Sequence, residues 1–512
     1  MDKKRAIISV YDKTGVEELG RRLLALGYEL VSTGGTYRTL VNAGLDVTYI
    51  SDVTGFPEIL GGRVKTLHPN VHGGILAKRS LPEHRAELEE AGIKPVDLVA
   101  VNLYPFQTTV AKPEVTMAEA LENIDIGGPT MIRAAAKNFP EVIVLVNPAK
   151  YGEVCTQLEA AGDLSYSDRL SLAQEAFAHT AQYDAAIQDY LWKEQDQEGF
   201  PPQLLLAYEK AQELRYGENP HQKAQFYREA GLTRTGLLNA KQLHGKELSF
   251  NNINDANAAL EILAEFTEPA AVCVKHTNPC GVAVGEDIET AYTRAYAGDP
   301  VSIFGGIVAL NREVDKATAT KLHEIFLEII LAPKFSPEAL EILTQKKNLR
   351  LLEVDLANVN ATVDFKKVVG GLLVQEADKL LLEEANLQPV TEQQPSPELL
   401  ADLLFAWKVV KHVKSNAIVV AKGGRTLGIG AGQMNRIDPT HYALNAAGAE
   451  VKGAVLASDA FFPMPDVVQA CAEKGIAAII QPGGSIRDED SIQEANKAGI
   501  AMLFTGIRHF KH

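Results

Sequence analysis

A lysine and a histidine stand side by side where an apolar stretch ends, at Lys275 and His276. Residues 270–274 before them are small or apolar and predict a buried strand, and Asn, Pro and Gly within residues 278–281 predict a tight turn. In proteins that alternate strands with helices, functional residues gather at such strand ends. An ammonium group can stabilise a developing oxyanion, and an imidazole can take a proton near neutral pH. The pair suggests proton transfer, while a surface lysine beside a histidine that only hydrogen-bonds to the turn fits the pattern as well.

Two successive loops between a strand and a helix in the N-terminal region carry hydroxyl groups, glycines and a lysine. These residues are Ser9, Lys13, Thr14, Ser32, Thr33, Gly34, Gly35 and Thr36. Backbone N–H groups at a helix N-terminus favour an anion, and glycine lets the backbone approach a ligand closely. Either loop alone is more typical of an ordinary helix cap, and neither matches a Walker A or dinucleotide motif. Two such loops on neighbouring strands favour a phosphate site.

A third cluster of basic side chains lies in residues 61–74, a loop rich in Gly, Pro, Arg, Lys and His. So many donors suggest an anion clamp, and a solvated surface loop is the competing interpretation. Tyr104 stands at the mouth of a strand, and Asp125 precedes a helix on which Arg133 and Lys137 share a face. These groups can donate and accept protons. The alternatives are a carboxylate that only complements a helix dipole and a solvated basic stripe.

The bulk composition limits the possible classes of protein. The chain has 512 residues, 46% hydrophobic and 23% charged, which indicates a soluble globular protein of two to four domains. A net charge of −16 argues against a general nucleic-acid or anionic-membrane binder, although a local basic pocket can still hold an anionic substrate. Four scattered cysteines contain no C-x-x-C pair and predict reduced thiols. No stretch resembles a signal peptide or a membrane span, so we expect a cytoplasmic protein.

The first 150 residues alternate predicted strands with predicted helices, which is typical of a parallel, doubly wound α/β sheet. The residues from Thr14 to Glu17 predict a capping box at the start of the first helix. Apolar residues at helical spacing continue to about residue 192. The strands are predicted at 6–10, 29–32, 47–51, 98–102 and 142–146, and the later helical segments at 170–178 and 183–192.

Two polar stretches predict the domain organisation. The run at 193–202 predicts a boundary between a first domain, 1–200, and a second region, 201–512. The stretch at 386–397 divides this region into lobes of about 201–385 and 398–512. Both lobes contain a strand that runs into a polar turn, which suggests a duplicated unit. The Gly-rich segment 427–433 predicts a strand turn near a substrate rather than a dinucleotide loop.

The N-terminal segments together resemble the cyclohydrolase half of the bifunctional purine-biosynthesis family that combines AICAR transformylase with IMP cyclohydrolase. The resemblance implies an α/β domain of the methylglyoxal-synthase-like fold. It also implies that Lys65, Tyr104, Asp125 and Lys137 close the purine ring. In that reaction a weakly nucleophilic carboxamide nitrogen attacks a formyl carbon before water leaves, so cations and acid–base groups are the side chains it needs. The implied substrate-binding residues, mostly for the ribose 5-phosphate, are Ser9, Lys13, Thr14, Ser32, Gly34, Gly35, Thr36, Arg63, Thr66 and Asn102.

The resemblance extends through the C-terminal region, over motifs at 215–222, 248–252, 302–306, 414–417, 458–463 and 507–510. It implies two lobes of cytidine-deaminase-like fold. The zinc pattern of the deaminases is missing, since His276 is not followed by a Glu and Cys280 has no partner, so we expect no metal. For formyl transfer, His276 would be the base, with Lys275 and Asn416 as oxyanion or carboxamide partners. The remaining implied ligand-binding residues are Arg215, Tyr216, Phe304, Asp459, Phe461 and Arg508.

Some of these assignments have plain structural alternatives. Asp459 is equally typical of a turn or a helix cap, and a phenylalanine such as Phe304 or Phe461 is more often a core residue than a ligand contact. Taken with the resemblance, the sequence predicts a bifunctional enzyme with small-molecule substrates and no nucleic-acid or membrane partner. It would transfer formyl from the co-substrate 10-formyltetrahydrofolate to AICAR and close the product to IMP, acting as a homodimer. The alternative is a lyase that uses Lys275 as a Schiff base, with an N-terminal phosphate-sensing regulatory domain.

Overall fold

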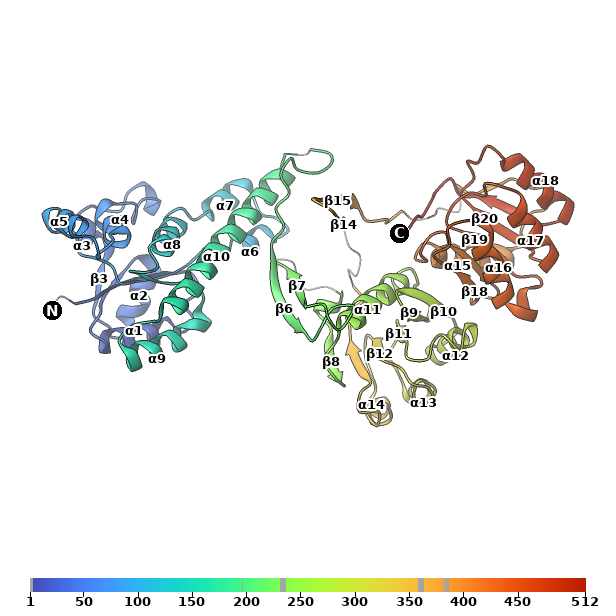
Figure 1. Cartoon of the computed structure of the whole chain (residues 1–512), viewed down its shortest axis with the longest axis horizontal. Helices are drawn as coiled ribbons and strands as arrows, with labels where there is room; N and C mark the ends of the chain where they lie inside the picture. The colour runs from blue at the N-terminus through green and yellow to red at the C-terminus, as the bar shows by residue number, and fades with distance from the viewer. Residues whose placement is uncertain (1–2, 196, 231–235, 358–362, 381, 383–385) are drawn as a thin grey trace. The chain divides into compact units, whose positions relative to one another are not determined.

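The computed structural model describes residues 3–195, 197–230, 236–357, 363–380, 382 and 386–512. The chain forms two compact units, Met1–Glu209 with Glu229–Leu232 and Lys210–Arg228 with Thr233–His512 (Figure 1). The lobe boundary expected at residue 385 lies outside the described residues. The domain limits drawn from the sequence therefore stay predictions.

The first unit is built around a five-stranded parallel sheet with the order β3-β2-β1-β4-β5. All five predicted strands are confirmed, and the third ends early, at Tyr49, because a short helix starts at Ile50. Every residue of β4 is buried, as expected for a strand covered on both faces. The strands are β1 (Arg5–Val10), β2 (Glu29–Ser32), β3 (Val47–Tyr49), β4 (Leu98–Asn102) and β5 (Ile143–Leu145).

Helices cover both faces of this sheet, with α1, α2 and α9 on one side and α4 and α8 on the other (Figure 1). The predicted capping box is wrong: α1 begins after Gly15 with no side-chain cap, because the Thr14 hydroxyl donates to Asp12 instead. The two predicted helical segments after residue 170 are one helix, α10. The helices are α1 (Val16–Ala25), α2 (Gly34–Asn42), α3 (Ile50–Thr54), α4 (Pro69–Leu76), α5 (Pro82–Glu90), α6 (Phe106–Val110), α7 (Met117–Glu122), α8 (Gly127–Lys137), α9 (Tyr151–Ala161) and α10 (Tyr166–Lys193).

The second unit contains two six-stranded sheets with the same topology, β10-β9-β11-β12-β13-β8 and β18-β17-β19-β20-β21-β16. In each sheet a hairpin is followed by three strands parallel to one another, and the last strand is antiparallel. The strands of the first are β8 (Lys241–His244), β9 (Ala270–Lys275), β10 (Asn278–Val284), β11 (Ile307–Leu310), β12 (Ile329–Ala332) and β13 (Arg350–Glu353). Those of the second are β16 (Gln388–Pro389), β17 (Ile418–Ala421), β18 (Thr426–Gly430), β19 (Val455–Ser458), β20 (Ala478–Gln481) and β21 (Ala501–Phe504).

The helices of the second unit fall at equivalent places between these strands, as a duplicated unit predicts. The first lobe has α11 (Phe250–Leu263), α12 (Ile288–Gly298), α13 (Lys316–His323) and α14 (Pro337–Leu343). The second has α15 (Pro397–Val410), α16 (Ile437–Ala446), α17 (Asp466–Lys474) and α18 (Asp488–Ala498). Two small hairpins complete the fold, β6 (Tyr208–Leu214) with β7 (Ala224–Glu229) and β14 (Val363–Val368) with β15 (Gly371–Glu376). The cytidine-deaminase-like character of the lobes stays a prediction.

Equivalent glycines explain the Gly-rich segment of the second lobe. A Cβ atom on Gly281 of β10 would lie 2.1 Å from the Ala295 carbonyl oxygen of α12. On Gly428 of β18 it would lie 2.1 Å from the Ala443 carbonyl oxygen of α16. The expected substrate turn at 427–433 is therefore wrong in its first part, which is a strand whose glycines let the next helix pack closely.

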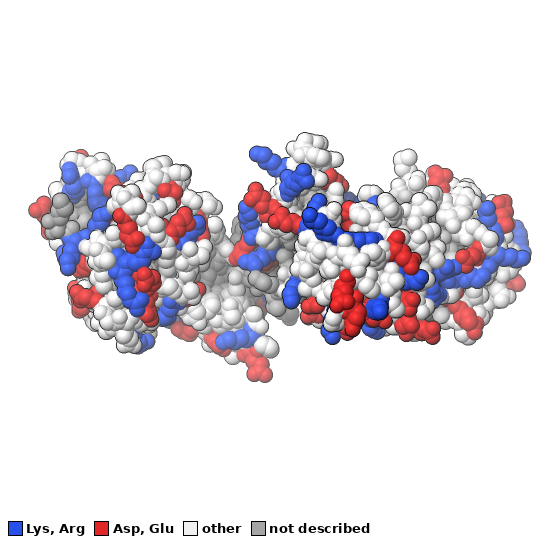
Figure 2. Space-filling model, turned by 90° about the horizontal axis from the view of Figure 1, so that it is seen from below, with Lys and Arg blue, Asp and Glu red and all other residues white. Residues whose placement is uncertain are grey.

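The helices and the charged surface agree with the composition. No helix within the described ranges combines the length and the apolar character that crossing a membrane requires. On the face that Figure 2 presents, acidic and basic side chains are interspersed rather than gathered into one basic field.

Candidate active sites

Three loops meet at the carboxyl edge of the first sheet, where β1, β2 and β4 end. The backbone N–H groups of Tyr11 and Asp12 donate to Asn102 Oδ1 over 2.6 and 2.9 Å. Asn102 Nδ2 donates back to the Asp12 carbonyl over 3.0 Å. The buried Asn102 side chain thus holds the loop after β1 against β4.

Two ammonium groups lie at the N-terminus of α2. A Cβ atom on Gly35 would be 3.7 Å from Lys13 Nζ, and one on Gly34 would be 3.7 Å from Lys65 Nζ. The N–H groups of the first helical turn and the helix dipole add positive potential at the same point. Lys13 and Lys65, which are far apart in sequence, therefore converge on a place suited to a phosphate.

Of the hydroxyl groups predicted to bind phosphate, some are hydrogen-bonded to the backbone of β1 and others are accessible. Ser32 Oγ donates to the Ile8 carbonyl over 2.6 Å, and Thr36 Oγ1 donates to the Val10 carbonyl over 2.8 Å. Both side chains are buried and satisfied by β1, so they position the loop. Ser9 is partly exposed and pairs with Thr33 over 2.9 Å, which leaves a hydroxyl pair near the anion site.

Lys65, Tyr104 and Asp125 are electrostatic neighbours. Burial raises the pKa of Asp125, while the N–H groups of Gly128 and Gly127 and the charge of Lys65 act in the opposite direction. Burial also raises the pKa of Tyr104, helped by the negative charge of Asp125. Gly128 N donates to Asp125 Oδ1 over 2.9 Å at the start of α8. A cation, a phenol and a carboxyl group with raised pKa therefore share one site.

A glutamate that the sequence did not single out belongs to this group. Glu58 Oε2 lies 3.4 Å from Lys65 Nζ, and the Tyr49 hydroxyl donates to Glu58 Oε1. The hydrogen bond to Glu58 raises the pKa of Tyr49. A single acidic residue after Phe-Pro carries no distinctive sequence signal, because the contact forms only when the loop folds back.

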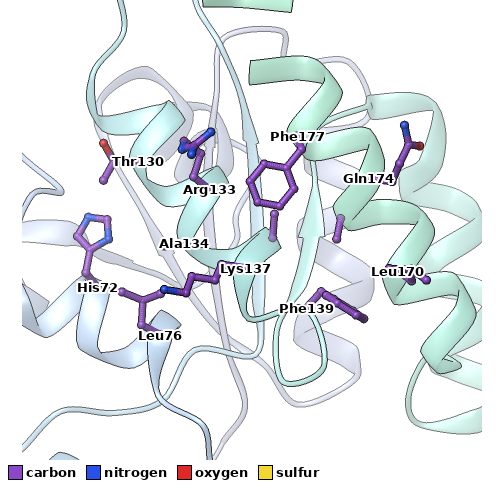
Figure 3. Close-up of a pocket in the computed structure, with 12 residues that line it drawn as sticks. His72, Leu76, Thr130, Arg133, Ala134, Lys137, Phe139, Leu170, Gln174 and Phe177 are labelled. Carbon is purple, nitrogen blue, oxygen red and sulfur yellow. The ribbon is translucent and has the colours of Figure 1, made fainter. Parts of the chain in front are cut away.

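The structure does not bring Lys137 together with the other three ring-closing candidates. Lys137 is the last residue of α8, about 15 Å along the helix axis from Gly127 beside Asp125. It lines a separate cavity of about 630 Å³ with His72, Arg133 and Phe177 (Figure 3). The structure therefore places Lys137 apart from Lys65, Tyr104 and Asp125, and its ring-closing role stays a prediction.

Arg63 and Thr66 occupy the loop before α4. The Arg63 guanidinium is exposed and forms an ion pair with Glu122. Thr66 is buried, and its hydroxyl oxygen would lie 2.6 Å from a Cβ atom on Gly127. Thr66 thus faces the N-terminus of α8, and Arg63 contacts an acidic side chain of α7 instead of the anion site.

In the second unit, Lys275 ends β9 and reaches across to a loop. Its Nζ donates to the carbonyl oxygens of Phe304 and Gly305 over 3.1 and 2.9 Å. An ammonium group has three donors, so one N–H remains for a ligand. The two carbonyls fix the direction of that remaining donor.

The turn beside Lys275 differs from the sequence prediction. The turn residues are His276 and Thr277, both with positive φ, at 53° and 63°. Asn278 and Pro279, which were expected to form the turn, already belong to β10, and Asn278 pairs with Lys275. The His276 side chain is exposed at the corner of this two-residue hairpin.

Asn416 lies in the other lobe, just before β17. We expected a strand to run into a polar turn here, as it does at Lys275, and this prediction is wrong because Asn416 precedes its strand. Arg436 Nη2 donates to Asn416 Oδ1 over 2.7 Å, and Asn416 Nδ2 donates to the Gln433 carbonyl over 3.0 Å. Lys414 N donates to Asn278 Oδ1 over 3.0 Å, which links the Asn416 segment to the His276 turn.

Asp459 is fully buried and holds the segment around Asn416 in place. It forms an ion pair with Arg436 and accepts from Ala417 N over 3.1 Å and from the Ser415 hydroxyl. The carboxylate has no exposed surface, so it holds Arg436 and cannot itself contact a ligand. Sequence reasoning missed Arg436, because an arginine before a helix carries no pattern of its own.

The remaining candidates are largely exposed. Phe304 and Phe461 are 63% and 38% exposed, whereas the neighbouring Phe462 is a core residue at 0%. The Arg215 guanidinium lies over the Tyr216 ring at 5.5 Å. In the same way, the Arg508 guanidinium lies 4.5 Å from the centre of the Phe510 ring. These side chains are available to a ligand.

The described residues contain no cluster of side chains that could hold a metal ion. Across the part of the chain that the structure describes, no three His, Cys, Asp or Glu side chains gather as metal ligands would. The expectation of metal-free chemistry stays a prediction.

Comparisons with known proteins identify the family of this chain. A family model described as AICARFT/IMPCHase bienzyme matches residues 135–446, and one described as MGS-like domain matches residues 15–130. The Bifunctional purine biosynthesis protein PurH of Bacillus cereus (strain AH820) is 60% identical over 511 residues, which is 100% of both chains. Proteins of the same name from Bacillus anthracis (strain CDC 684 / NRRL 3495) and Bacillus thuringiensis (strain Al Hakam) match equally well.

A solved structure titled Crystal structure of ForH is 41% identical and covers 37% of this chain and 100% of its own. The TM-score between the two structures is 0.35. The family matches confirm an MGS-like N-terminal domain followed by an AICARFT/IMPCHase region. The chain belongs to the AICARFT/IMPCHase bienzyme family, bifunctional enzymes of purine biosynthesis with AICAR formyltransferase and IMP cyclohydrolase activities.

Proposed function

We propose that the first unit closes the purine ring and that the second transfers the formyl group. The observation that carries this division is the separation of the two chemical groups. Lys65, Tyr104 and Asp125 share one unit, and Lys275, His276 and Asn416 share the other. Each group contains a cation for a developing oxyanion and a group that can move a proton.

Ring closure would start with formyl-AICAR held by its phosphate at the N-terminus of α2, between Lys13 and Lys65. The carboxamide nitrogen then attacks the formyl carbon, and the former carbonyl oxygen becomes the oxyanion, which the Lys65 ammonium stabilises. Asp125 and Tyr104 exchange the protons that leave nitrogen and reach the departing hydroxyl, so that one water is lost. Because the reaction is intramolecular, positioning supplies part of the acceleration.

Formyl transfer would use 10-formyltetrahydrofolate as the co-substrate. The AICAR amine attacks the formyl carbon while His276 takes the proton from the amine nitrogen. The third N–H of Lys275 and the Asn416 amide stabilise the tetrahedral oxyanion or hold the neighbouring carboxamide. The C–N10 bond then breaks, N10 gains a proton, and formyl-AICAR and tetrahydrofolate leave.

Exposed residues of the second unit would bind the two substrates. Arg215 and Arg508 suit the AICAR phosphate or the folate glutamate, since a guanidinium binds such oxyanions with two parallel donors. Phe304 and Phe461 suit the flat pterin ring. We propose a supporting role for Asp459, which would act through Arg436 and Asn416.

A homodimer and a cytoplasmic location remain predictions from the family resemblance. The alternative of a Schiff-base lyase gains no support, because two carbonyl oxygens already fix Lys275 Nζ as a donor. Such a lysine must lose its proton to attack a carbonyl carbon.

The division of labour is tested with Asp125→Asn. We expect ring closure from preformed formyl-AICAR to fall about 10²- to 10⁴-fold, the usual range for a lost general acid–base group. Formyl transfer, followed by the absorbance of released tetrahydrofolate, should be unchanged in the same protein. Normal ring closure, or an equal loss of both activities, would contradict the assignment.

A further inference from the structure

The His276–Thr277 turn has an unfavourable backbone. Within the described part of the chain, the non-glycine residues with positive φ are Leu60, His276 and Thr277, so two of the three are consecutive and stand at one turn. Two-residue hairpins with positive φ at both positions favour Asn and Gly. Thr277 is β-branched, and such residues are outliers in the left-handed region.

Three hydrogen bonds hold this turn. Thr277 N donates to Asp255 Oδ1 over 2.7 Å, a bond strengthened by the charge of the carboxylate. The Thr277 hydroxyl and Asn278 Nδ2 both donate to the His276 carbonyl, over 2.7 and 3.1 Å. Asp255 is the member that lies outside the turn and comes from another element.

The position of Asp255 is itself fixed by the sequence. Ser249 and Asn252 form a capping box, with Asn252 N donating to Ser249 Oγ over 3.2 Å and Ser249 N donating to Asn252 Oδ1 over 3.1 Å. This box determines where α11 begins, and Asp255 follows one turn later on the helix. The carboxylate is therefore delivered to the turn by a rigid element that packs on β9.

We propose that Asp255 is a positioning residue for formyl transfer, which keeps the His276–Thr277 turn left-handed and so aims the His276 imidazole. The proposal rests on the proposed role of His276 as the base. Strained backbone clusters at functional sites where the surroundings over-determine it, and a small misplacement of a catalytic group is costly. The strain at Thr277 has this form: an external carboxylate holds a conformation that the residue itself disfavours.

Two substitutions of Asp255 separate positioning from general stability. Asp255→Ala removes the acceptor for Thr277 N, and we expect kcat for formyl transfer to fall about tenfold or more, with KM for AICAR nearly unchanged. Asp255→Asn keeps an acceptor oxygen at the same place and should retain most of the activity. Ring closure from preformed formyl-AICAR, performed by the other unit, should be normal in both variants.

Thr277→Gly is the second probe, because it does not remove a buried group. Glycine adopts positive φ readily, so the midpoint of urea unfolding should be kept or raised, while formyl transfer should fall several-fold as the turn loosens. Opposite changes in stability and activity are not expected from a purely structural residue.

Wild-type kcat in Asp255→Ala, or equal losses in Asp255→Ala and Asp255→Asn, would overturn the proposal. The variant His276→Ala separates this failure from a failure of the proposed function. If His276→Ala transfers formyl normally, the base is misassigned and the positioning role fails with it. If His276→Ala is inactive while Asp255→Ala is fully active, the positioning role alone is wrong.

Discussion

Glu265 forms a buried ion-pair cluster between the two lobes of the second unit. Its Oε1 accepts from Lys411 Nζ over 2.8 Å and lies 2.9 Å from His412 Nε2. The side chains of Glu265, Lys411 and His412 are 13%, 8% and 10% exposed. Burial lowers the pKa of His412, and its Nε2–H donates to the Glu265 carboxylate.

The expected effect of Glu265→Gln follows from the pKa of this carboxyl group. Burial alone would raise the pKa of Glu265, but hydrogen bonds and charge from His412 and Lys411 lower it from 4.5 to about 2. That difference corresponds to about 3 kcal/mol of stability at neutral pH. The substitution also leaves the Lys411 charge buried without its partner, which is costly for the same reason. We expect Glu265→Gln to destabilise the second unit by about 3 kcal/mol.

The pH dependence has a definite sign. The pKa of Glu265 is lower in the folded state than in the unfolded chain, so its contribution is fully present above about pH 4.5 and is lost as the pH falls toward 2. The carboxylate's part of the difference between wild type and Glu265→Gln should therefore shrink as the pH falls below 4.5.

Tryptophan fluorescence during urea unfolding measures this effect in the intact chain. The sequence has two tryptophans, and Trp407 is buried in the second unit. A Trp192→Phe background leaves Trp407 as the reporter. The control is Glu261→Gln, on α11 one turn before Glu265. Glu261 forms a 2.9 Å ion pair with Lys511, and the two side chains are 33% and 38% exposed. Such a partly exposed pair should contribute less than about 1 kcal/mol. An unchanged midpoint for Glu265→Gln, or equal losses in both variants, would refute the reasoning.

Two further predictions concern packing and phosphate binding. Gly281→Ala should destabilise the second unit by about 2 kcal/mol or more, because its Cβ would lie 2.1 Å from the Ala295 carbonyl oxygen. An unchanged midpoint of urea unfolding would show that α12 can move away. Lys13→Gln should raise KM for formyl-AICAR about 10- to 100-fold, because a charged hydrogen bond to phosphate is lost, and formyl transfer should be unaffected. Steady-state kinetics of ring closure test this prediction. An unchanged KM would exclude Lys13 from the anion site.

Much of the first unit follows from local sequence patterns. The five strands are short apolar runs bounded by turn residues, and their order of appearance with helices between them predicts a parallel sheet. The place of the proposed anion site also follows from the pattern, because the strand ends of a parallel sheet meet at one edge. What the pattern cannot give is which hydroxyls face the ligand: Ser32 and Thr36 are occupied by the backbone of β1.

The errors have a common physical cause, since tertiary contacts override local preferences. Asn278 and Pro279 have strong turn propensity, yet they pair with β9 because Asp255 and the hairpin register hold the bend at His276 and Thr277. Glu58, Arg436 and Asp255 were missed for the same reason. Arg436 and Asp255 contact segments that are distant in sequence, and Glu58 reaches Lys65 only when their loop folds back. A single charged side chain has no periodic signal.

The central claim is that His276 is the base for formyl transfer in a site separate from ring closure. Its most direct measurement is the rate of tetrahydrofolate release by His276→Ala from AICAR and 10-formyltetrahydrofolate, beside the rate of IMP formation from preformed formyl-AICAR. We predict that formyl transfer falls about 10²-fold or more while ring closure stays at the wild-type rate. Formyl transfer at the wild-type rate, or loss of both activities together, would contradict the assignment.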